Sequence, residues 1–344
     1  MNKKLIILGN GFSIDFISQI KSENKNSEEI QNISLTNLFS NGDKVPCPWD
    51  INEKGFLSFE NCPNLWTLGA RPDISTEKAN SIILDIVTST NAFLRFKDKK
   101  DRATRPKLDN IEDKIYLCAY CELKEYIKSL MLYYNSLIDD TCISDMLKQK
   151  KWGWEKIFQE IKDPKIETNI ITYNYDLWLE RILNILSIEY DLLQNTGKNI
   201  QIIKPHGSIN YVDKTNTAPF LKIAYSLNDS IKIDDIEIKQ DASKKSIIIP
   251  PAGESIKAGS WSKNIRELSF HCAESITNVD KILICGISYW NVDRYEIDEL
   301  LCSVDSECPI CFINPNPPSE FNATLMSIFK KYKVFKTSNS LKNI

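Results

Sequence analysis

Three features that would assign a function at once are missing from this sequence. There is no excess of positive charge, since the formal net charge is −3 at pH 7 and the sequence pI is about 5.7. Such a chain has no general attraction to phosphate backbones, so nucleic acid is not expected as a partner. No run approaches the roughly 18 apolar residues of a membrane span, and the first residues lead into a short strand rather than a secretory signal. We therefore expect a cytoplasmic protein without a membrane segment.

Histidine is scarce in the sequence and cysteine is abundant. Only 2 of the 344 residues are histidine, whereas 10 are cysteine. A chain of this length with 42% hydrophobic residues can bury a full core without disulfides, so we expect reduced thiols. Two pairs have Cys-x-x-Cys spacing, Cys118 with Cys121 and Cys308 with Cys311. The first pair lies in a helical pattern and the second borders an apolar strand, so we interpret both as small buried residues and expect no metal.

Short apolar segments recur along the chain, and each ends in a polar or glycine-containing turn. They predict strands at residues 3–8, 170–173, 201–204, 246–250, 281–285, 309–313 and 333–336. Helical periodicity follows most of these segments, as it does after Asp176 and after Asp293. The alternation predicts an α/β fold with a doubly wound, mostly parallel, Rossmann-like sheet. The polar turns should all fall on one edge of that sheet.

The segment between the first two predicted strands lacks a convincing strand pattern. We therefore expect a single domain over residues 1–344 with a largely helical insertion at about 22–163, although the composition fits two domains equally well. Residues 41–72 are rich in proline and glycine and predict an irregular connection. Residues 95–107 carry both signs of charge without apolar periodicity and predict a solvated, mobile loop.

A long helix with an apolar stripe from Leu123 to Ile138 is expected to follow that loop. Tyr126, Leu132 and Tyr133 lie off the stripe and indicate a second apolar contact. The sequence does not decide whether that contact is within the chain or with another protein. Since aromatic residues are enriched in interfaces, we expect a homo-oligomer or a regulatory partner, a nucleotide-handling protein among the candidates.

The first candidate site is the turn after the strand at 170–173. This strand delivers Asn174 and Asp176 to its carboxyl end, and a helix begins at or just after Asp176. In open α/β sheets ligands bind outside the carboxyl ends of strands, so a polar turn here is a candidate binding site. The alternative is that Asp176 only caps the helix and Asn174 only makes the turn.

A second candidate follows the first strand, which runs directly into Gly9-Asn10-Gly11. Two glycines so placed let the backbone turn tightly and approach a phosphate at a helix N-terminus. The third glycine of the dinucleotide fingerprint is replaced by Ile14, and no second strand ends in an acidic residue about 20 positions on. A hydride-transferring dehydrogenase is therefore disfavoured, and a tight structural turn explains the glycines equally well.

The third candidate is His206, in the turn Pro205-His206-Gly207-Ser208 after the strand at 201–204. A lone histidine is more often structural than catalytic, but a second strand-end turn beside a glycine favours a functional role. The other histidine, His271, lies in a helical run and is interpreted as structural.

Taken in order, five motifs resemble those of a known family. GNGFSID, TYNYD, PHGS, CGIS and INPN are similar to the motifs of the sirtuin-like, silent-information-regulator family of NAD-consuming enzymes, and most of all to its bacterial branch that hydrolyses NAD in defence against phage. The resemblance covers roughly residues 1–20 and 165–320. It implies NAD as the substrate, phosphate contacts at Gly9, Gly11, Phe12 and Ser13 with Asp15 nearby, ribose contacts at Asn174 and Asp176, a catalytic His206, and adenosine contacts at Gly286, Ser288 and Asn314.

Two departures from that family bear on the reaction. Protein-deacylating sirtuins carry two Cys-x-x-Cys pairs between the histidine and the glycine-serine turn, but here only Cys272 and Cys285 lie there. The arginine-bearing loop that follows the first glycines is also absent, since the first arginine is Arg71. Hydrolysis of NAD is therefore favoured. The alternatives are a catalytically weak sensor subunit that binds NAD or ADP-ribose, and an enzyme that transfers ADP-ribose or removes acyl groups.

The residue types also suit this chemistry independently of the family. Nicotinamide in NAD is already a cationic leaving group, so its release needs a placed nucleophile and stabilisation of an oxocarbenium-like transition state rather than a strong acid. His206 is suited to take a proton from water or a ribose hydroxyl. Asn174 can orient that water, and Asp176 can offer negative charge or hold a hydroxyl.

Overall fold

The computed structural model describes residues 2–49, 53–100, 114–192, 196–213, 231–233, 246–250, 252–253, 262–277 and 280–343. The chain divides into two compact units, which are described separately here. The first unit comprises residues 1–31, 137–207 and 264–344, and the second comprises 32–136 and 208–263. The expected insertion at about 22–163 differs from this division in two ways. Residues 22–31 and 137–163 belong to the first unit, and residues 208–263 join the second.

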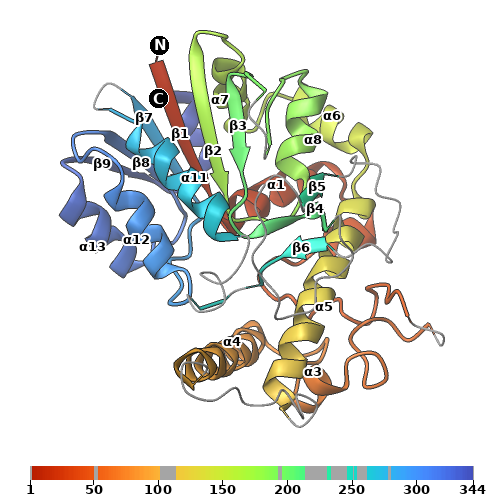
Figure 1. The fold of residues 1–344 in the computed structure, drawn as a ribbon. Helices are drawn as coiled ribbons and strands as arrows, with labels where there is room; N and C mark the ends of the chain where they lie inside the picture. The colour runs from red at the N-terminus through yellow and green to blue at the C-terminus, as the bar shows by residue number, and fades with distance from the viewer. Residues whose placement is uncertain are drawn as a thin grey trace. The chain divides into compact units, whose positions relative to one another are not determined.

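A six-stranded parallel sheet forms the centre of the first unit (Figure 1). Its strand order is β3-β2-β1-β7-β8-β9, and every neighbouring pair is parallel. The strands are β1 (Asn2–Leu8), β2 (Ile166–Thr172), β3 (Ile200–Ile203), β7 (Lys281–Cys285), β8 (Pro309–Ile313) and β9 (Lys331–Phe335). The predicted doubly wound α/β fold is thereby confirmed.

The winding of this sheet reverses between β1 and β7. From β1 the chain moves outward to β2 and β3, through connections that contain α1 (Asn10–Glu23) and α8 (Trp178–Ile185). From β7 it moves in the opposite direction to β8 and β9, through α12 (Arg294–Cys302) and α13 (Ser319–Ile328). Because parallel crossovers are right-handed, the two sets of helices lie on opposite faces. The β1/β7 pair is therefore the topological switch point, where such sheets bind ligands.

Strand register brings the ends of neighbouring strands level with one another. Leu8 pairs with Thr172 on one side and with Cys285 on the other. The turn that begins at Gly9 thus starts beside the turns that follow β2 and β7. The strands read as almost continuous apolar runs because both faces of a parallel sheet are covered, and Leu5, Ile6, Ile7 and Leu8 are all buried.

The remaining helices of the first unit complete its core. They are α2 (Glu28–Gln31), α6 (Asp140–Lys148), α7 (Trp154–Ile161), α11 (Ser262–Glu274) and the short 3₁₀ helix η2 (Ser338–Asn343). An aromatic cluster fills the space between α1 and α7, where the Phe12 ring meets Trp154 edge to face at 5.1 Å and Trp152 at 5.7 Å. Such pairs contribute about 0.5–1.5 kcal/mol each beyond the area they bury, so α1 is firmly held.

Within the described residues, the second unit combines three helices with a small sheet. Its elements are α3 (Pro63–Thr67), α4 (Thr76–Lys100), α5 (Ile115–Leu137), β4 (Gly207–Asp213), β5 (Ile231–Ile233) and β6 (Ser246–Ile248), and the strand order is β5-β4-β6. The strand expected at 246–250 therefore belongs to this sheet and not to the parallel one, which is a correction. The apolar run alone could not distinguish the two sheets.

Helix α5 corrects the expected second contact surface. The apolar stripe from Leu123 to Ile138 is buried, as predicted, but Tyr126 is buried as well. Its hydroxyl donates to the backbone oxygen of Leu38 at 2.6 Å, and its ring packs on Phe39 and Phe56. Leu38, Phe39 and Phe56 of the same chain thus make the contact that was left open at Tyr126. Leu132 and Tyr133 are half-buried.

The charged segment 95–107 is partly helical, which is a third correction. Helix α4 continues to Lys100, because the helical pattern that begins at Thr76 runs on without a breaking residue. Residues 101–107 lie outside the described part of the chain. In the proline- and glycine-rich stretch 41–72, the described residues 41–49 and 53–72 are irregular apart from α3, as expected.

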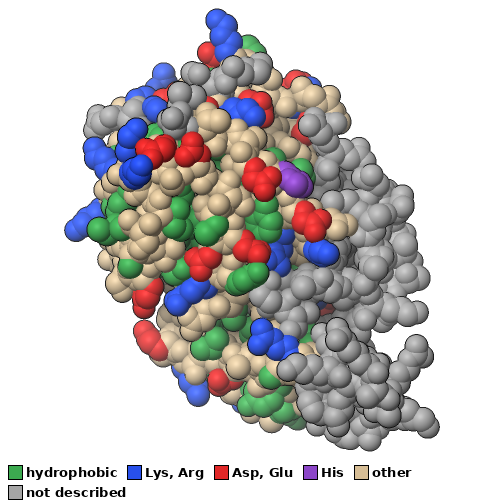
Figure 2. Space-filling view, turned by 60° about the vertical axis from the view of Figure 1, so that its left-hand side comes forward, with side chains coloured by type: hydrophobic (Ala, Val, Ile, Leu, Met, Phe, Trp, Pro, Cys, Tyr) green, Lys and Arg blue, Asp and Glu red, His purple; other side chains and the backbone are tan. Residues whose placement is uncertain are grey.

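Surface and thiol properties agree with the composition. Acidic and basic side chains are interspersed on the face drawn in Figure 2. All ten cysteines are free, and burial raises the pKa of Cys121 to about 12 and that of Cys308 to about 11. Among the described helices none combines the length and apolar character needed to cross a membrane.

Candidate functional site

The glycines after β1 and β7 are in direct backbone contact. The Gly9 amide donates to the Cys285 oxygen at 2.9 Å, and the Gly11 amide donates to the Gly286 oxygen at 3.1 Å. A Cβ on Gly11 would lie 2.3 Å from the Gly286 Cα, and Gly286 has a φ of +64°. Close packing of two turns therefore explains why these positions are glycine. The Gly11 amide already donates a hydrogen bond within the protein, so it is not available to bind a phosphate. This favours the tight structural turn over a phosphate-binding turn that uses the Gly11 amide.

Three polar side chains meet where β1 and β2 end. The Asn174 Nδ2 donates to the Gly9 oxygen at 3.0 Å and to the Ser13 Oγ at 2.9 Å. The Ser13 hydroxyl in turn donates to Asp176 Oδ2 at 2.6 Å. All three side chains are buried, so this chain of hydrogen bonds fixes the strand-end turn against the first turn of α1.

Asp176 is occupied by structural contacts. While Oδ2 accepts from Ser13, Oδ1 accepts from the Trp178 amide at 3.2 Å, at the start of α8. Burial is the largest influence on this carboxyl group and raises its pKa above the ordinary value. Both carboxylate oxygens of Asp176 are thus engaged within the protein, one by the Ser13 hydroxyl and the other by the first backbone amide of α8.

Asn174 keeps one polar atom available. Its Nδ2 has two acceptors, the Gly9 oxygen and the Ser13 Oγ, whereas the hydrogen bonds among the described residues include none to Oδ1. An amide held rigidly through its nitrogen presents its oxygen in a fixed direction, which suits the orientation of a water or a hydroxyl. Oδ1 is therefore the atom of this turn that can serve a ligand.

A buried ion pair joins the end of β3 to α8. The Lys204 ammonium donates to Glu180 Oε1 at 2.8 Å and to the backbone oxygen of Asp176 at 2.6 Å, and both charged side chains are 1% exposed. Two buried charges are tolerated only when they are paired in this way. The contact holds the end of β3, which carries His206, close to the turn of Asn174 and Asp176.

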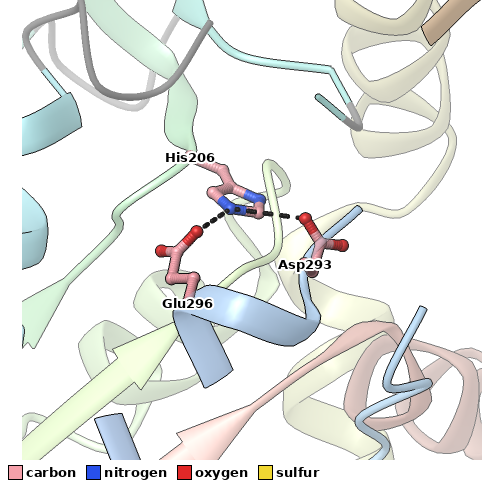
Figure 3. Close-up of side chains that lie close together, drawn as sticks. All are labelled: His206, Asp293 and Glu296. Atoms are coloured by element: carbon pink, nitrogen blue, oxygen red, sulfur yellow. Dashed lines mark hydrogen bonds and ion pairs between the residues drawn. The ribbon is translucent and has the colours of Figure 1, made fainter. Parts of the chain in front are cut away.

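His206 lies in the loop after β3 and faces two carboxylates of α12 (Figure 3). Its Nε2 is 3.1 Å from Glu296 Oε2 and 3.9 Å from Asp293 Oδ1. The imidazole is 4% exposed, and the Tyr173 ring contacts it at a centroid distance of 5.0 Å and an angle of 65°. Asp293 is the N-cap residue of α12 and Glu296 lies in its first turn, so both carboxylates stand at the positive end of that helix.

A guanidinium on α11 balances part of this negative charge. The Arg266 Nε is 3.6 Å from Glu296 Oε1, and another guanidinium nitrogen is 3.6 Å from Glu299 Oε2. Glu296 therefore has a cation or an imidazole beside each oxygen. Burial raises the pKa of Tyr173 well above its ordinary value, and the nearby charges of Glu296 and Asp293 add to that effect.

His206, Asp293 and Glu296 also form a possible metal-ligand group, since their ligand atoms lie within 4.8 Å of one another. Imidazole and carboxylate are ordinary ligands for zinc and similar ions at about 2.0–2.2 Å. The 3.1 Å contact from His206 to Glu296 is however a normal hydrogen-bond length, and the Arg266 guanidinium next to Glu296 opposes a further cation. We therefore interpret the group as a hydrogen-bonded cluster.

Four of the predicted site residues lie apart from these contacts. The Phe12 side chain belongs to the aromatic core, and Asp15 accepts a hydrogen bond from Trp152 Nε1 at 2.7 Å on the side of α1 that faces α7. Ser288 is exposed in the turn after β7. The Asn314 Nδ2 lies 3.4 Å from the Ile287 oxygen, and so links the turns after β8 and β7.

Sequence reasoning missed the partners of His206. The sequence indicates only that a helix follows Asp293, and it assigns no role to Glu296, Tyr173 or Arg266. The sequence does contain one signal for Asp293 and Glu296. Acidic residues at the N-cap and three positions later lie together at the start of a helix, and a helix that follows a parallel strand begins at the edge of the sheet where the strands end. No comparable signal identifies Arg266, whose helix precedes β7.

A surface hollow of about 380 Å³ lies elsewhere in the first unit, lined by Lys150, Trp152, Glu155, Lys156, Gln159 and Lys342. It contains none of the candidate residues.

Comparisons with protein-family models and with curated proteins give no match. The assignment of a function therefore depends on the residues at the sheet edge.

Proposed function

We propose that this protein hydrolyses NAD to nicotinamide and ADP-ribose. One observation carries the proposal: an amide oxygen and an imidazole follow two adjacent strands, one position from the switch point of a doubly wound sheet. The β2/β3 register pairs Ile171 with Ile203, and its continuation sets Asn174 level with His206. The Tyr173 ring, one residue before Asn174, contacts the imidazole. These are the two groups that a water nucleophile needs, one to orient it and one to take its proton.

The reaction can be written with these groups alone. Water held by Asn174 Oδ1 attacks the anomeric carbon of the nicotinamide ribose, while His206 takes a proton from it. The glycosidic bond breaks with its electron pair moving to the pyridinium nitrogen, so nicotinamide leaves neutral. The proton on His206 then passes to solvent. No acid is needed for the leaving group, because nicotinamide leaves as a neutral molecule.

Such an activity is hazardous to the cell that contains it. At a common turnover number of about 10 per second an unrestrained enzyme would exhaust cellular NAD quickly. We therefore propose that the protein is a defence effector that depletes NAD and is restrained until triggered. Restraint by self-association or by a partner protein is part of this proposal, with NAD loss in expressing cells as its readout.

Product analysis of the purified protein tests the proposed reaction. We expect stoichiometric nicotinamide and ADP-ribose from NAD by chromatography, and no change in product ratio when an acyl-lysine peptide is added. Binding of NAD without release of nicotinamide would indicate a binding module instead. O-acyl-ADP-ribose, or ADP-ribose attached to protein, would indicate deacylation or transfer.

A further inference from the structure

We propose that Glu296 is the positioning residue of His206: it accepts the Nε2 proton and thereby makes Nδ1 the atom that takes the proton during NAD cleavage. The catalytic part of this inference rests on the proposed function, whereas the assignment of the proton to Nε2 does not. Nothing in the sequence motifs assigns a role to Glu296, which lies eight residues beyond Ser288, the last residue of the CGIS motif.

The geometry at Nε2 leaves little freedom. Glu296 Oε2 is 3.1 Å from Nε2, and both side chains are almost completely buried. Glu296 is on the first turn of α12, a regular element, and Arg266 stands beside its other oxygen. The Arg266 contact is an ion pair at 3.6 Å and not a hydrogen bond, so the position of the carboxylate depends on α12 and on its burial. A buried carboxylate on a regular helix is a well-placed acceptor that can orient the ring.

The position of the ring proton follows from the chemistry of the partner. An ionised carboxylate only accepts hydrogen bonds, so the nitrogen that faces it must carry hydrogen. In a neutral imidazole the other nitrogen then holds the lone pair. That nitrogen is Nδ1, which has no hydrogen-bond partner within the described residues and lies on the ring edge away from Glu296 in Figure 3.

The second carboxylate has a different part. Asp293 Oδ1 is 3.9 Å from Nε2, beyond hydrogen-bond length, and its side chain is 23% exposed. It does not choose the tautomer, but its charge favours the imidazolium that forms when Nδ1 takes a proton. Arg266 offsets this attraction, and Glu299 in turn partly offsets Arg266. Among the residues that the structure describes, Tyr173 is the remaining titratable group in contact with the ring.

The other histidine provides an internal control for the imidazole. His271 Nδ1 is 3.2 Å from Glu274 Oε2, which is again an imidazole–carboxylate contact, but it uses the opposite nitrogen and its side chain is 76% exposed. An exposed contact of this kind is weak and exchanges with water. His271 should therefore report an average of tautomers, whereas His206 should report one.

Nitrogen-15 NMR of the full chain labelled at histidine measures the tautomers directly. With only two histidines, the His271→Gln variant leaves the His206 signals alone. We expect neutral His206 to show a protonated Nε2 and an unprotonated Nδ1. We expect Glu296→Ala to give averaged signals, and Asp293→Asn to leave the single tautomer unchanged. A proton on Nδ1 in the parent protein, or an unchanged tautomer in Glu296→Ala, overturns the inference.

Steady-state kinetics then separates positioning from folding. Loss of a carboxylate that orients a catalytic histidine costs between about 10- and 10⁴-fold in kcat. We expect Glu296→Gln, which preserves size, to fall in this range with KM for NAD within about twofold, and Asp293→Asn to stay within about threefold in kcat. Thermal unfolding of each variant checks that it is folded. An unchanged kcat in folded Glu296→Gln would overturn the catalytic part.

Two further results distinguish the competing explanations. If the parent protein cleaves no NAD while His206 has the expected tautomer, the proposed function fails and the tautomer assignment stands. A zinc titration tests the metal-site explanation. If equimolar Zn²⁺ shifts the Nε2 signal of His206, and if Asp293→Asn needs at least ten times more zinc for the same shift, the group is a metal site and the positioning role is overturned.

Discussion

The two strand-end turns that carry Asn174 and His206 are adjacent in the sheet but are held in different ways. The Asn174 turn is fixed by hydrogen bonds to a backbone oxygen and a hydroxyl, and its carboxylate, Asp176, is consumed by structural contacts. The His206 loop is held by charges, with carboxylates beside the imidazole and a guanidinium behind them. The hydrogen bonds at the Asn174 turn fix its geometry. The charges at the His206 loop act on an imidazole that takes up a proton in the proposed reaction. The predictions below separate these two roles.

Removal of the imidazole should have the largest effect. General base catalysis is worth about 10²–10⁴-fold, so we expect His206→Ala to reduce kcat by up to about 10⁴-fold. Its stability loss should be about 1–3 kcal/mol, since Glu296 loses a buried partner. Nicotinamide release is the measurement. His271→Ala is the control and should retain parental activity, because His271 is exposed. Parental activity in folded His206→Ala would refute its catalytic role.

The buried ion pair behind both turns should matter mainly for stability. Lys204→Met preserves much of the side-chain volume but leaves Glu180 buried without its cation. We expect a loss of about 3–5 kcal/mol in the free energy of unfolding, measured by urea titration. Removing both charges in Lys204→Met/Glu180→Leu should recover most of that loss. Failure of the double variant to recover would mean that Lys204 acts chiefly through the Asp176 oxygen.

Loss of the amide in the hydrogen-bonded turn should reduce catalysis more than stability. We expect Asn174→Ala to lower kcat by about 10²–10³-fold, because removal of one preorganised polar group that contacts the reacting atoms reduces kcat by about this factor. The Ser13 hydroxyl can still donate to Asp176, so the free energy of unfolding should fall by only about 1–2 kcal/mol. Asn174→Asp is the matched variant, because it keeps Oδ1 but loses the donor to Gly9. An equal kcat for Asn174→Ala and the parent protein would contradict the assignment of Oδ1.

Asp15 tests whether a residue of the glycine motif acts outside the site. Its carboxylate accepts from the buried Trp152 indole, so Asp15→Ala should cost about 1–3 kcal/mol of stability. We expect KM for NAD to change by less than about twofold. Asp15→Asn keeps an acceptor oxygen and should restore most of the stability in a thermal melt. A large rise in KM with unchanged melting would place Asp15 back among the NAD contacts.

The smallest effect is a pH dependence of stability from Asp176. Burial raises its pKa, so the native state holds this proton more tightly than the unfolded chain. Its stabilising contribution is fully present below the unfolded pKa of about 3.9 and is lost as pH rises through the higher native value. Asp176→Asn does not titrate, so its stability relative to the parent protein should improve as pH rises through that window. Urea titrations from pH 4 upward measure the difference, and a constant difference would contradict it.

The sequence predicts the fold of the first unit well for a physical reason. Strands of a parallel sheet are buried on both faces, and their apolar runs at 281–285 and 309–313 coincide with β7 and β8. The small sheet could not be anticipated in the same way. Segment 246–250 has the same composition as a parallel strand, and its assignment depends on pairing with distant residues. Gly207 was expected in a turn, but β4 begins there.

The candidate site could be predicted only to the level of the strand ends. Asn174 and His206 are identified by their place after apolar runs, but the sequence does not tell which atoms remain available for a ligand. The Ser13 hydroxyl donates to Asp176, and these two residues are 163 positions apart in the sequence. Likewise, Glu296 reaches His206 across 90 positions. Pairing over such separations is set by the completed sheet and has no local signal.

The backbone contact between Gly11 and Gly286 has a consequence for motion. The turns after β1 and β7 contact each other through main-chain atoms at Gly11 and Gly286. Since no side chain lies between these atoms, no change of rotamer can accommodate a shift of one turn. Sliding or opening at this point would break the Gly11 hydrogen bond in a tightly packed region. The two halves of the doubly wound sheet therefore move as one body here. Any opening that admits a ligand has to come from the loops at the sheet edge rather than from a hinge at the switch point.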